Sequence, residues 1–372
     1  MARYRLGSIC QIISGSTPKT GVQAYWNGDK KWITPAELSE SDYIIYDTER
    51  KLTEAGVKSA GLTMLPKGTV ILSSRAPIGK VAIAGCEMYC NQGFKNLVCS
   101  DIISNKYLYW YLRSKTDFLN SLGRGATFKE ISKSTVAEIE LNVPELSEQS
   151  KRVAHLEKLQ SIIASRRIQL AKLDELVKCR FVEMFGDAKN NPYGWISETV
   201  DSVTEEIIGG VSVSGEARKI QKGELAVLKV SAVTYGVFKC DEYKVISNDI
   251  KLGKYVSPKK GDLLFSRANT KELVGATALV DKDYPHLLLP DKIWKIVVSD
   301  KVSPVYLKAY LSEPWIRELM SKVATGTSGS MYNISMEKLR QIPVILPPIE
   351  RQNAFATFVH RIDKLRFFVW LV

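Results

Sequence analysis

Apolar side chains recur with a helical period over one long central stretch of this chain. From Ser147 to Phe185 there is no Pro or Gly, and the apolar residues step by three and four positions. This spacing is a heptad seam, which is typical of helices that pack against one another. We therefore predict a long helix over 147–186, roughly 58 Å in length at the usual rise per residue. Its predicted helix-pairing positions are Leu156, Leu159, Ile163, Leu170, Leu173 and Val177.

A second and shorter heptad seam follows Pro347-Pro348 at the end of the chain. It predicts a second spacer helix over 347–372, much shorter than the first and unusually apolar in its last residues. Its predicted pairing positions are Phe355, Phe358, Ile362 and Leu365. This helix looks truncated beside the first, so we expect the two helices to pair incompletely.

Two β-rich stretches occupy the rest of the chain, over 1–146 and 187–346. Turn residues such as Pro66-Lys67-Gly68 separate short apolar runs such as Val70-Ile71-Leu72, which is the pattern of short strands and loops. We therefore expect a domain of mixed strands and helices in each stretch.

The two stretches repeat the same residues in the same order. The matching pairs are Lys67-Gly68 with Lys260-Gly261, Ser74-Arg75 with Ser266-Arg267, and Ile131–Gln149 with Ile334–Gln352, the last without a gap. The period is far longer than that of a solenoid, so we predict two homologous domains, each followed by a helix. In this alignment Arg75 and Arg267 occupy equivalent positions.

Charge and cysteine usage indicate the partner and the compartment. The net charge of +12 and the pI of about 9.2 favour a polyanionic partner, although solubility alone is an alternative explanation. The six cysteines form no Cys-x-x-Cys pair, the N-terminus lacks an apolar signal core, and no apolar run reaches membrane-spanning length. We expect a cytoplasmic protein with free thiols and no membrane partner.

No residue pattern in the chain predicts catalysis, a metal site or a cofactor. Asn190-Asn191-Pro192-Tyr193 lacks the first proline of the methyltransferase loop Asn-Pro-Pro-Tyr, and no Gly-x-Gly-x-x-Gly or Walker loop is present. Glu242-x-Lys244 is half of a nuclease pattern, but the only Pro-Asp pair, Pro290-Asp291, lies on the wrong side of it. The three histidines have no neighbouring cysteines that would support zinc. We therefore predict a chain without catalytic residues, metal ligands or cofactors.

Several segments together resemble the specificity subunit of type I restriction-modification systems. The matching segments are Leu6-Gly7-Ser8-Ile9 through Gly15-Ser16-Thr17-Pro18, Trp32-Ile33-Thr34-Pro35, Pro66-Lys67-Gly68-Thr69-Val70 through Arg75-Ala76-Pro77-Ile78-Gly79, Asn91-Gln92-Gly93-Phe94, Gly125-Ala126-Thr127-Phe128-Lys129-Glu130-Ile131, Val143-Pro144-Glu145-Leu146, and the linker Phe185-Gly186-Asp187 with Gly194-Trp195. The resemblance covers essentially the whole chain.

This resemblance implies an α+β fold with two homologous β-rich target recognition domains. They would be separated by long antiparallel conserved-region helices that form a coiled-coil spacer. The implied role is non-catalytic recognition of a bipartite, asymmetric site in double-stranded DNA, with one domain for each half-site. The implied partners are two methyltransferase subunits and, optionally, two restriction subunits, and enzymatic activity would belong to the assembled complex alone.

Side chains that suit base edges and phosphates are Asn, Gln, Arg, Lys, Ser and Thr on loops. In the first domain we predict DNA contacts from Ser16, Thr17, Lys19, Arg75, Lys80, Asn91, Gln92, Lys95, Arg124, Thr127 and Lys129. In the second domain we predict them from Lys229, Ser231, Arg267, Asn269, Lys271, Lys292, Thr325, Thr327, Ser328 and Tyr332. Arg75 and Arg267 are the two strongest candidates, because each follows an apolar strand at its repeat position.

Two other functions remain open at this point. The short last helix favours an inactive or decoy specificity subunit that does not hold its methyltransferase. An autonomous DNA methyltransferase or nuclease is the second alternative, and the missing glycine-rich loop argues against it. Methyl transfer or cleavage by the isolated chain separates the enzyme from the recognition subunit.

Overall fold

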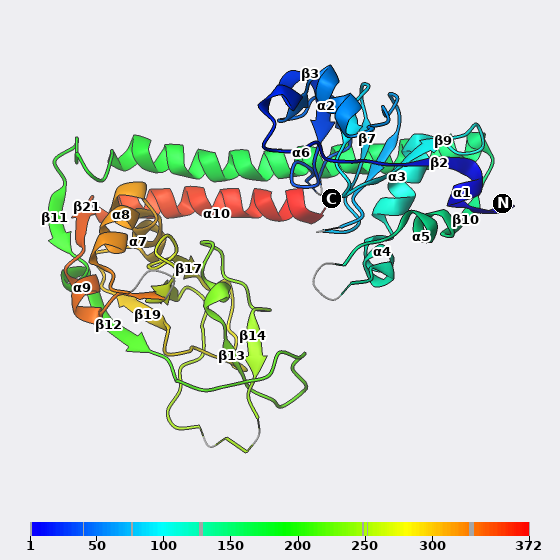
Figure 1. The fold of residues 1–372 in the computed structure, drawn as a ribbon. Coiled ribbons are helices and arrows are strands. Elements are labelled where there is room, and N and C mark those ends of the chain that lie inside the picture. Colours follow the sequence, from blue (N-terminus) through cyan, green and yellow to red (C-terminus); the bar gives the residue numbers. More distant parts are fainter. Residues whose placement is uncertain are drawn as a thin grey trace. The chain divides into compact units, whose positions relative to one another are not determined.

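The computed structural model of the protein describes residues 2–39, 41–75, 77–125, 129–247, 249–250, 252–326 and 331–371. The chain divides into two compact units, 1–164 and 165–372, and the division falls inside the long helix α6, Leu146–Phe185. Each unit combines short strands with helices (Figure 1). No helix among the described residues is both long enough and apolar enough to cross a membrane.

The described residues of the first unit form three small sheets. Its largest sheet has the order β2-β9-β6-β7-β4, with bounds Cys10–Ser14, Lys95–Cys99, Val70–Leu72, Val81–Ala84 and Ile44–Ile45. The other sheets are β5-β3-β8 (Lys51–Leu52, Trp26–Ile33, Tyr89–Cys90) and β1-β10 (Ala2–Arg5, Glu140–Val143). The helices before α6 are α1 (Leu6–Ile9), the 3-10 helix η1 (Gln23–Tyr25), α2 (Glu54–Ser59), α3 (Asn105–Arg113), α4 (Thr116–Leu122) and α5 (Lys133–Ala137).

Both faces of the largest sheet are covered, and strand β6 shows how. Its residues Val70, Ile71 and Leu72 are completely buried. Val70 and Leu72 lie in one apolar cluster with Leu108 of α3, whereas Ile71 lies in a second cluster with Ile33 of β3. Successive strand side chains point to opposite faces, so a strand covered on both sides is apolar throughout and does not alternate.

The second unit repeats this architecture. Its largest sheet has the order β12-β19-β15-β17, with bounds Thr204–Gly209, Ile293–Val298, Leu263–Ser266 and Thr277–Leu279. The smaller sheets are β14-β13-β18 (Tyr243–Val245, Ala226–Leu228, Leu287–Leu288), β11-β21 (Ile196–Thr199, Pro343–Leu346) and β16-β20 (Ala268–Asn269, Tyr332–Asn333). The helices are η2 (Asp201–Val203), η3 (Val230–Ala232), α7 (Pro304–Leu311), α8 (Pro314–Val323), α9 (Met336–Arg340) and α10 (Ile349–Leu371). The duplication that the sequence predicts is therefore confirmed at the level of strand order.

A buried glutamine at the start of each long helix accounts for one part of the repeat. Gln149 accepts a hydrogen bond from Ser104 N at 2.8 Å and donates to Ile102 O and Pro144 O at 2.9 and 2.8 Å. Gln352 makes the same three bonds in the second unit, to Ser303 N, Lys301 O and Pro347 O at 2.9, 3.2 and 2.8 Å. Each glutamine thus ties its long helix to the loop that precedes α3 or α7.

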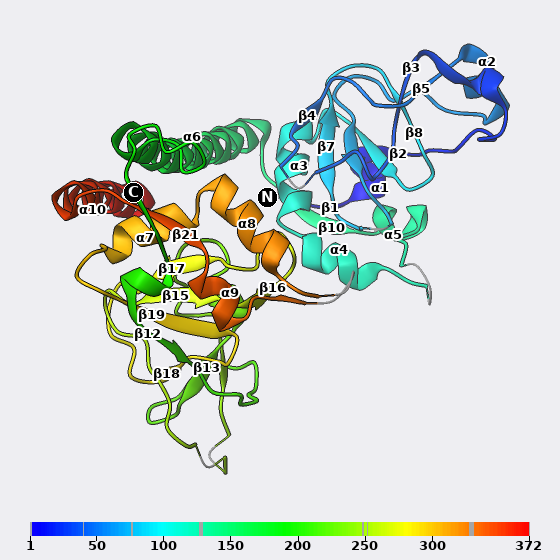
Figure 2. The same ribbon diagram turned by 90° about the vertical axis from the view of Figure 1, so that its left-hand side faces the viewer.

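Within the second unit, residues 165–185 of α6 pack antiparallel against α10 (Figures 1 and 2). Phe355, near the start of α10, contacts Phe181 and Phe185, with ring centroids 5.6 and 5.5 Å apart. Further along α10, Arg366 pairs with Asp174 at 2.5 Å. Contacts that advance along α10 therefore move backward along α6, which confirms the antiparallel arrangement of the two helices.

The predicted pairing seam is buried only in part. Phe355 and Ile362 are buried, and half-buried positions are Leu170, Leu173, Val177 and Phe358. The remaining predicted positions are exposed, with exposed fractions of 37% for Leu156, 55% for Leu159, 52% for Ile163 and 50% for Leu365. The two helices differ in length, with 40 residues in α6 and 23 in α10.

Candidate nucleic-acid interface

Three segments of the first unit meet where β6 ends: the end of β6, the turn after β8, and the hairpin that begins at Arg124. Ser74 N donates to Gly93 O at 2.8 Å, and Ile131 N donates to Ser74 O at 2.9 Å. Arg124 and Glu130 exchange two backbone hydrogen bonds of 3.0 and 2.9 Å, which close the hairpin. Predicted DNA contacts lie on the turn and on the hairpin, so the fold brings these sequence-distant residues to one place.

Lys95 lies at the centre of this meeting point and is 7% exposed. Its ammonium donates to Glu130 Oε1 at 3.0 Å, to Ser74 Oγ at 3.3 Å and to Gln92 O at 3.5 Å. An ammonium has three donors, so all of them have a protein acceptor here. Lys80 is also engaged within the unit, because its ammonium donates to Leu38 O. Lys95 therefore offers no free donor to a phosphate in this structure, whereas Lys80 uses one of its three donors in the bond to Leu38 O.

Ser16 and Thr17 are held against the same turn by the chain that leaves β2. Ser16 N donates to Cys90 O at 3.1 Å, and the Thr17 hydroxyl donates to Gln92 Oε1. Gly15 makes this approach possible, because a Cβ at that position would lie 2.1 Å from Cys90 O. The segment therefore needs glycine for its closeness to another backbone.

The other predicted contacts of the first unit lie closer to its surface. Arg75 and Asn91 are half-buried, and exposed positions are Lys19, Gln92, Arg124 and Lys129. Asn91 Oδ1 accepts from Gly93 N at 2.8 Å, so this amide shapes the turn. Thr127 lies outside the described residues.

Arg267 of the second unit is engaged with the turn before β19. Its Nε donates to Asp291 O at 2.7 Å, and its Nη2 lies 3.2 Å from Asp291 Oδ2. The guanidinium also lies 5.8 Å from the ring centroid of Trp294, within cation–π range. The Arg267 side chain is 28% exposed, so it is less enclosed than Lys95.

Lys229 and Ser231 both bind Glu242. Ser231 Oγ donates to Glu242 Oε2 at 2.7 Å, and the Lys229 ammonium lies 3.4 Å from the same oxygen. The hydrogen bond from Ser231, followed by the positive charge of Lys229, lowers the pKa of the Glu242 carboxyl. No three His, Cys, Asp or Glu side chains within the described residues gather as a metal site. The geometry therefore gives Glu242 a local structural role.

The remaining predicted contacts of the second unit surround β16 and its partner β20. Asn269 pairs with Tyr332 in the β16–β20 ladder, and its Nδ2 donates to Thr234 Oγ1 at 3.1 Å. Lys271 and Thr325 are exposed, and Lys292 is half-buried. Thr327 and Ser328 lie outside the described residues.

The predicted equivalence of Arg75 and Arg267 is wrong by one residue. Arg267 N donates to Lys292 O at 3.0 Å and Arg267 O accepts from Ile334 N, which are the bonds that Ser74 makes with Gly93 and Ile131. Arg267 is therefore the counterpart of Ser74. Arg75 forms an isolated bridge with Glu130, and Ala268 pairs with Asn333 in the β16–β20 ladder. The counterpart of Arg75 is therefore an alanine.

Sequence reasoning missed two carboxylates of the site. Glu130 pairs with Lys95, and Asp291 pairs with Arg267. Glu130 directly precedes the repeated Ile131-Ser132, and Asp291 belongs to the Pro-Asp pair that was weighed only as part of a nuclease pattern. Their positions beside repeat landmarks were the available signal, but the pairing depends on backbone register that residue order does not reveal.

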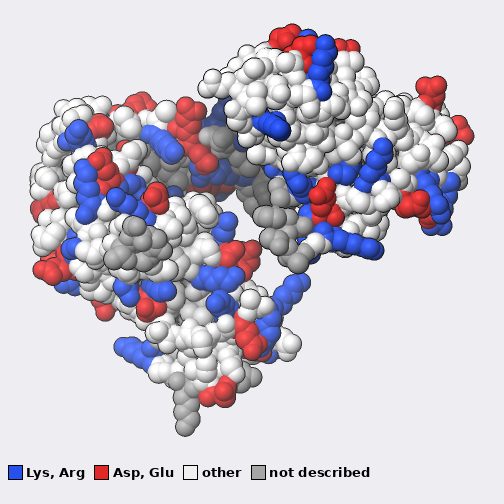
Figure 3. Space-filling model, viewed as in Figure 1, with Lys and Arg blue, Asp and Glu red and all other residues white. Residues whose placement is uncertain are grey.

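Positive and negative side chains are mixed on the face of the molecule that Figure 3 draws. Figure 3 shows both signs of charge interspersed on the viewed face, without a single continuous basic surface there.

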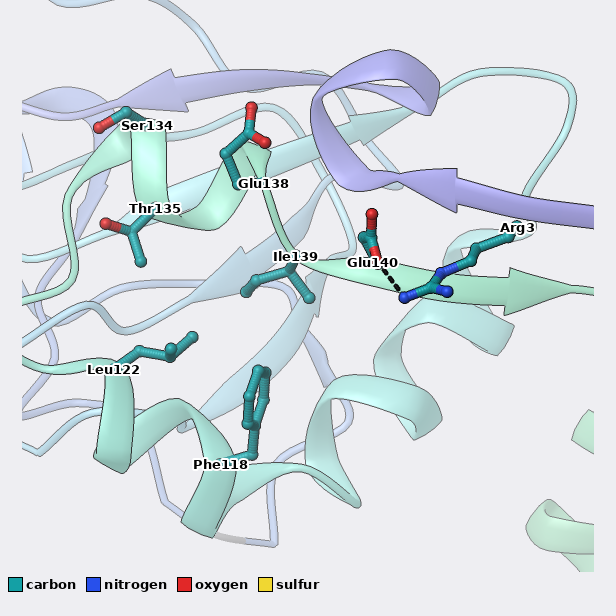
Figure 4. Close-up of a pocket in the computed structure, with 8 residues that line it drawn as sticks. All are labelled: Arg3, Phe118, Leu122, Ser134, Thr135, Glu138, Ile139 and Glu140. Carbon is teal, nitrogen blue, oxygen red and sulfur yellow. Dashed lines mark hydrogen bonds and ion pairs between the residues drawn. The ribbon is translucent and has the colours of Figure 1, made fainter.

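One cavity of the first unit is lined by other residues than the predicted DNA contacts. It is an open hollow of about 620 Å³ between α4, α5 and β10, lined by Arg3, Phe118, Leu122, Ser134, Thr135, Glu138, Ile139 and Glu140. Figure 4 shows Phe118 and Leu122 facing Ile139, with Arg3 paired to Glu140 at one side. None of these residues is a predicted DNA contact.

Two similar α+β domains, each followed by a long helix, define the fold class of this protein. Comparison with known families makes this specific, because the model of the "type I restriction modification DNA specificity domain" matches residues 1–174 and 200–367. The chain belongs to this family, and the resemblance that its sequence suggested is confirmed.

Individual relatives carry the same description. The chain is 36% identical over 231 residues to the type I restriction enzyme MjaIX specificity subunit of Methanocaldococcus jannaschii, a match that covers 60% of this chain and 52% of the relative. It is 24% identical over 317 residues to the EcoKI specificity subunit of Escherichia coli, covering 78% of this chain and 65% of the relative. The chain thus spans between half and two thirds of the length of these two relatives.

Solved structures share the fold. A chain from a study of complex assembly and conformational transition of the type I restriction-modification system superimposes with a TM-score of 0.58 at 17% identity, over 99% of this chain and 92% of that one. The S subunit of a type I system from M. genitalium gives a TM-score of 0.55 at 13% identity, over 99% and 90%. At these identities the likeness concerns the fold alone.

Proposed function

We propose that this chain is the DNA sequence-recognition subunit of a type I restriction-modification complex. Each unit reads one half of a bipartite, asymmetric site in double-stranded DNA. The chain itself carries no catalytic role, and methylation or cleavage is performed by subunits that assemble with it.

The observation that carries this proposal is the duplication. Four strands follow the same order in the largest sheets of the two units, and each unit places polar side chains on a hairpin and a neighbouring turn. A protein with two similar but non-identical readers suits a site with two different half-sites, because each reader is free to differ in the side chains that meet base edges.

Exposed cations on the first hairpin support contact with DNA. Arg124 and Lys129 are both exposed and lie at opposite ends of the loop. Charged side chains around a backbone turn suit phosphate contacts, which position a protein on the duplex, while neighbouring amides such as that of Gln92 suit base edges.

We propose further that α6 sets the distance between the half-sites and, with α10, provides the docking surface for methyltransferase subunits. The exposed apolar residues of α6 support the second point, since Leu156, Leu159 and Ile163 are each more than a third exposed. Two methyltransferase subunits and, optionally, two restriction subunits complete the proposed complex.

Co-expression tests the proposal. DNA adenine methylation is measured in cells that carry the chain with a cognate methyltransferase, the chain alone, or the methyltransferase alone. Sequence-specific methylation that needs both proteins is expected. Methylation or cleavage by the isolated chain would instead identify an autonomous enzyme, and an absence of methylation beside an active methyltransferase would identify a decoy subunit.

A further inference from the structure

The second unit has the same meeting point of three segments as the first, where Arg267 bonds to Lys292 and Ile334. The strand register shows which residues of the two units correspond. Ser73 forms a bridge with Phe94, and the ladder of the second unit pairs Ser266 with Ile293. Because β9 and β19 continue from these pairs, Lys95 corresponds to Trp294. Two residues before the pair Phe94 and Ile293, Gln92 corresponds to Asp291.

In both units a cation donates to the equivalent backbone carbonyl, that of Gln92 or that of Asp291. The cation comes from a different position of the chain in each unit. In the first unit, the Lys95 ammonium from β9 reaches Gln92 O at 3.5 Å. In the second, the Arg267 guanidinium from the end of β15 reaches Asp291 O at 2.7 Å. The counterpart of Lys95 in the second unit is Trp294, and the counterpart of Arg267 in the first unit is Ser74. Neither counterpart is charged.

Each cation is also neutralised by a carboxylate of its own unit. Lys95 pairs with Glu130 on the hairpin at 3.0 Å, and Arg267 pairs with Asp291 on the turn at 3.2 Å. A cation that is paired with a carboxylate and hydrogen-bonded to a backbone carbonyl holds both groups in position, since removing it leaves each of them without this partner.

We propose that Lys95 and Arg267 are positioning residues that fix the base-reading turn of each unit and do not themselves touch DNA. The turn of the first unit carries Asn91 and Gln92, whose amides suit adenine edges. This inference rests on the proposed function, and it replaces the DNA contacts that the sequence predicted for these two cations.

The test uses the full chain with its methyltransferase. Replacing Lys95 by Met is expected to relax base discrimination about tenfold or more in the half-site read by the first unit, and to leave the other half-site unchanged. Lys95→Arg is expected to retain discrimination, because it keeps a cation in reach of Gln92 O. Arg267→Met is expected to relax only the other half-site, and it serves as the second variant because its side chain is less buried.

Salt dependence distinguishes positioning from contact. With duplex that carries the mapped site, the slope of log affinity against log salt should be the same for wild type, Lys95→Met and Arg267→Met. A slope that falls by about one in either Met variant would make that cation a phosphate contact and overturn the inference.

Moving the cation tests the equivalence directly. Ser74→Arg in the Lys95→Met background supplies a guanidinium from the position that the second unit uses, so discrimination in the first half-site should recover. A folded double variant that recovers nothing would contradict the equivalence. If the wild type directs no bipartite methylation, the proposed function fails. If the wild type does so and both Met variants keep its base discrimination, only the inference about Lys95 and Arg267 is refuted.

Discussion

Single residues matter most where two backbones come close together. Gly15 and Gly210 hold equivalent positions, since an added Cβ would lie 2.1 Å from Cys90 O in one unit and 2.1 Å from Leu289 O in the other. Sequence comparison found the first glycine as part of a family segment, but not the reason for it. The carbonyls involved come from a strand that follows much later in the chain, and only the folded register brings them near.

Gly15→Ala should therefore destabilise the protein by about 3 kcal/mol, because either the β2 exit or the turn after β8 must shift. Thermal or urea unfolding measures the change. Gly21→Ala is the matched control, since a Cβ there meets no atom within 4 Å. Equal stability of the two variants would contradict the close approach of Gly15 to Cys90 O.

At the scale of elements, the long helix was the easiest feature to predict. Its heptad spacing and its freedom from Pro and Gly are local properties, and α6 runs from Leu146 to Phe185. The pairing of its seam was harder, because burial at Leu156 or Ile163 depends on what covers the helix and not on its own pattern. The equivalence of Arg75 and Arg267 failed for a similar reason: matching Ser-Arg letters shifted the alignment by one residue relative to the hydrogen bonds.

The glutamine at the start of α6 gives a prediction for this element. Gln149→Leu leaves Ser104 N, Ile102 O and Pro144 O without their partner, which should cost at least about 2 kcal/mol of unfolding free energy. Gln352→Leu should have a similar effect in the second unit. Gln160→Leu, half-buried on the same helix, is the control, and a loss as large as that of Gln149→Leu would argue against the buried hydrogen bonds as the cause.

Glu157 attaches α6 to the first unit and makes stability depend on pH. Tyr43 OH donates to its carboxylate at 2.5 Å and Lys106 pairs with it at 2.9 Å. The hydrogen bond from Tyr43, followed by that from Lys106, lowers the pKa of Glu157 below its ordinary value of 4.5. The stabilisation is therefore complete above pH 4.5 and is lost as pH falls through the folded-state pKa.

The expected consequence is a pH-dependent difference between wild type and Glu157→Gln. Wild type should be more stable at pH 7 by about 1 kcal/mol or less, because the pair is partly exposed to solvent. The difference should shrink as the pH drops below 4.5. Melting temperatures measured from pH 7 to pH 3.5 provide the test, and a constant difference would exclude a charged Glu157 as its source.

At the scale of the whole molecule, the positive charge becomes the relevant property. If DNA is the partner, binding releases counterions, so log affinity should fall linearly with log salt. Removing the exposed cations with Arg124→Ala and Lys129→Ala together should reduce the slope by about two. Lys58→Ala on α2, outside the predicted interface, should leave it unchanged. A wild-type affinity that does not vary with salt would contradict phosphate contacts.

The most direct test of the account is the shape of the methylated sequence. A genome-wide methyl-adenine map is made from cells that express this chain with its methyltransferase. Because two non-identical units each read one block, we expect one motif with two specified blocks. The blocks should differ from each other and be separated by unspecified bases. A single contiguous motif, or two identical blocks, would contradict the claim that the two units read two different half-sites.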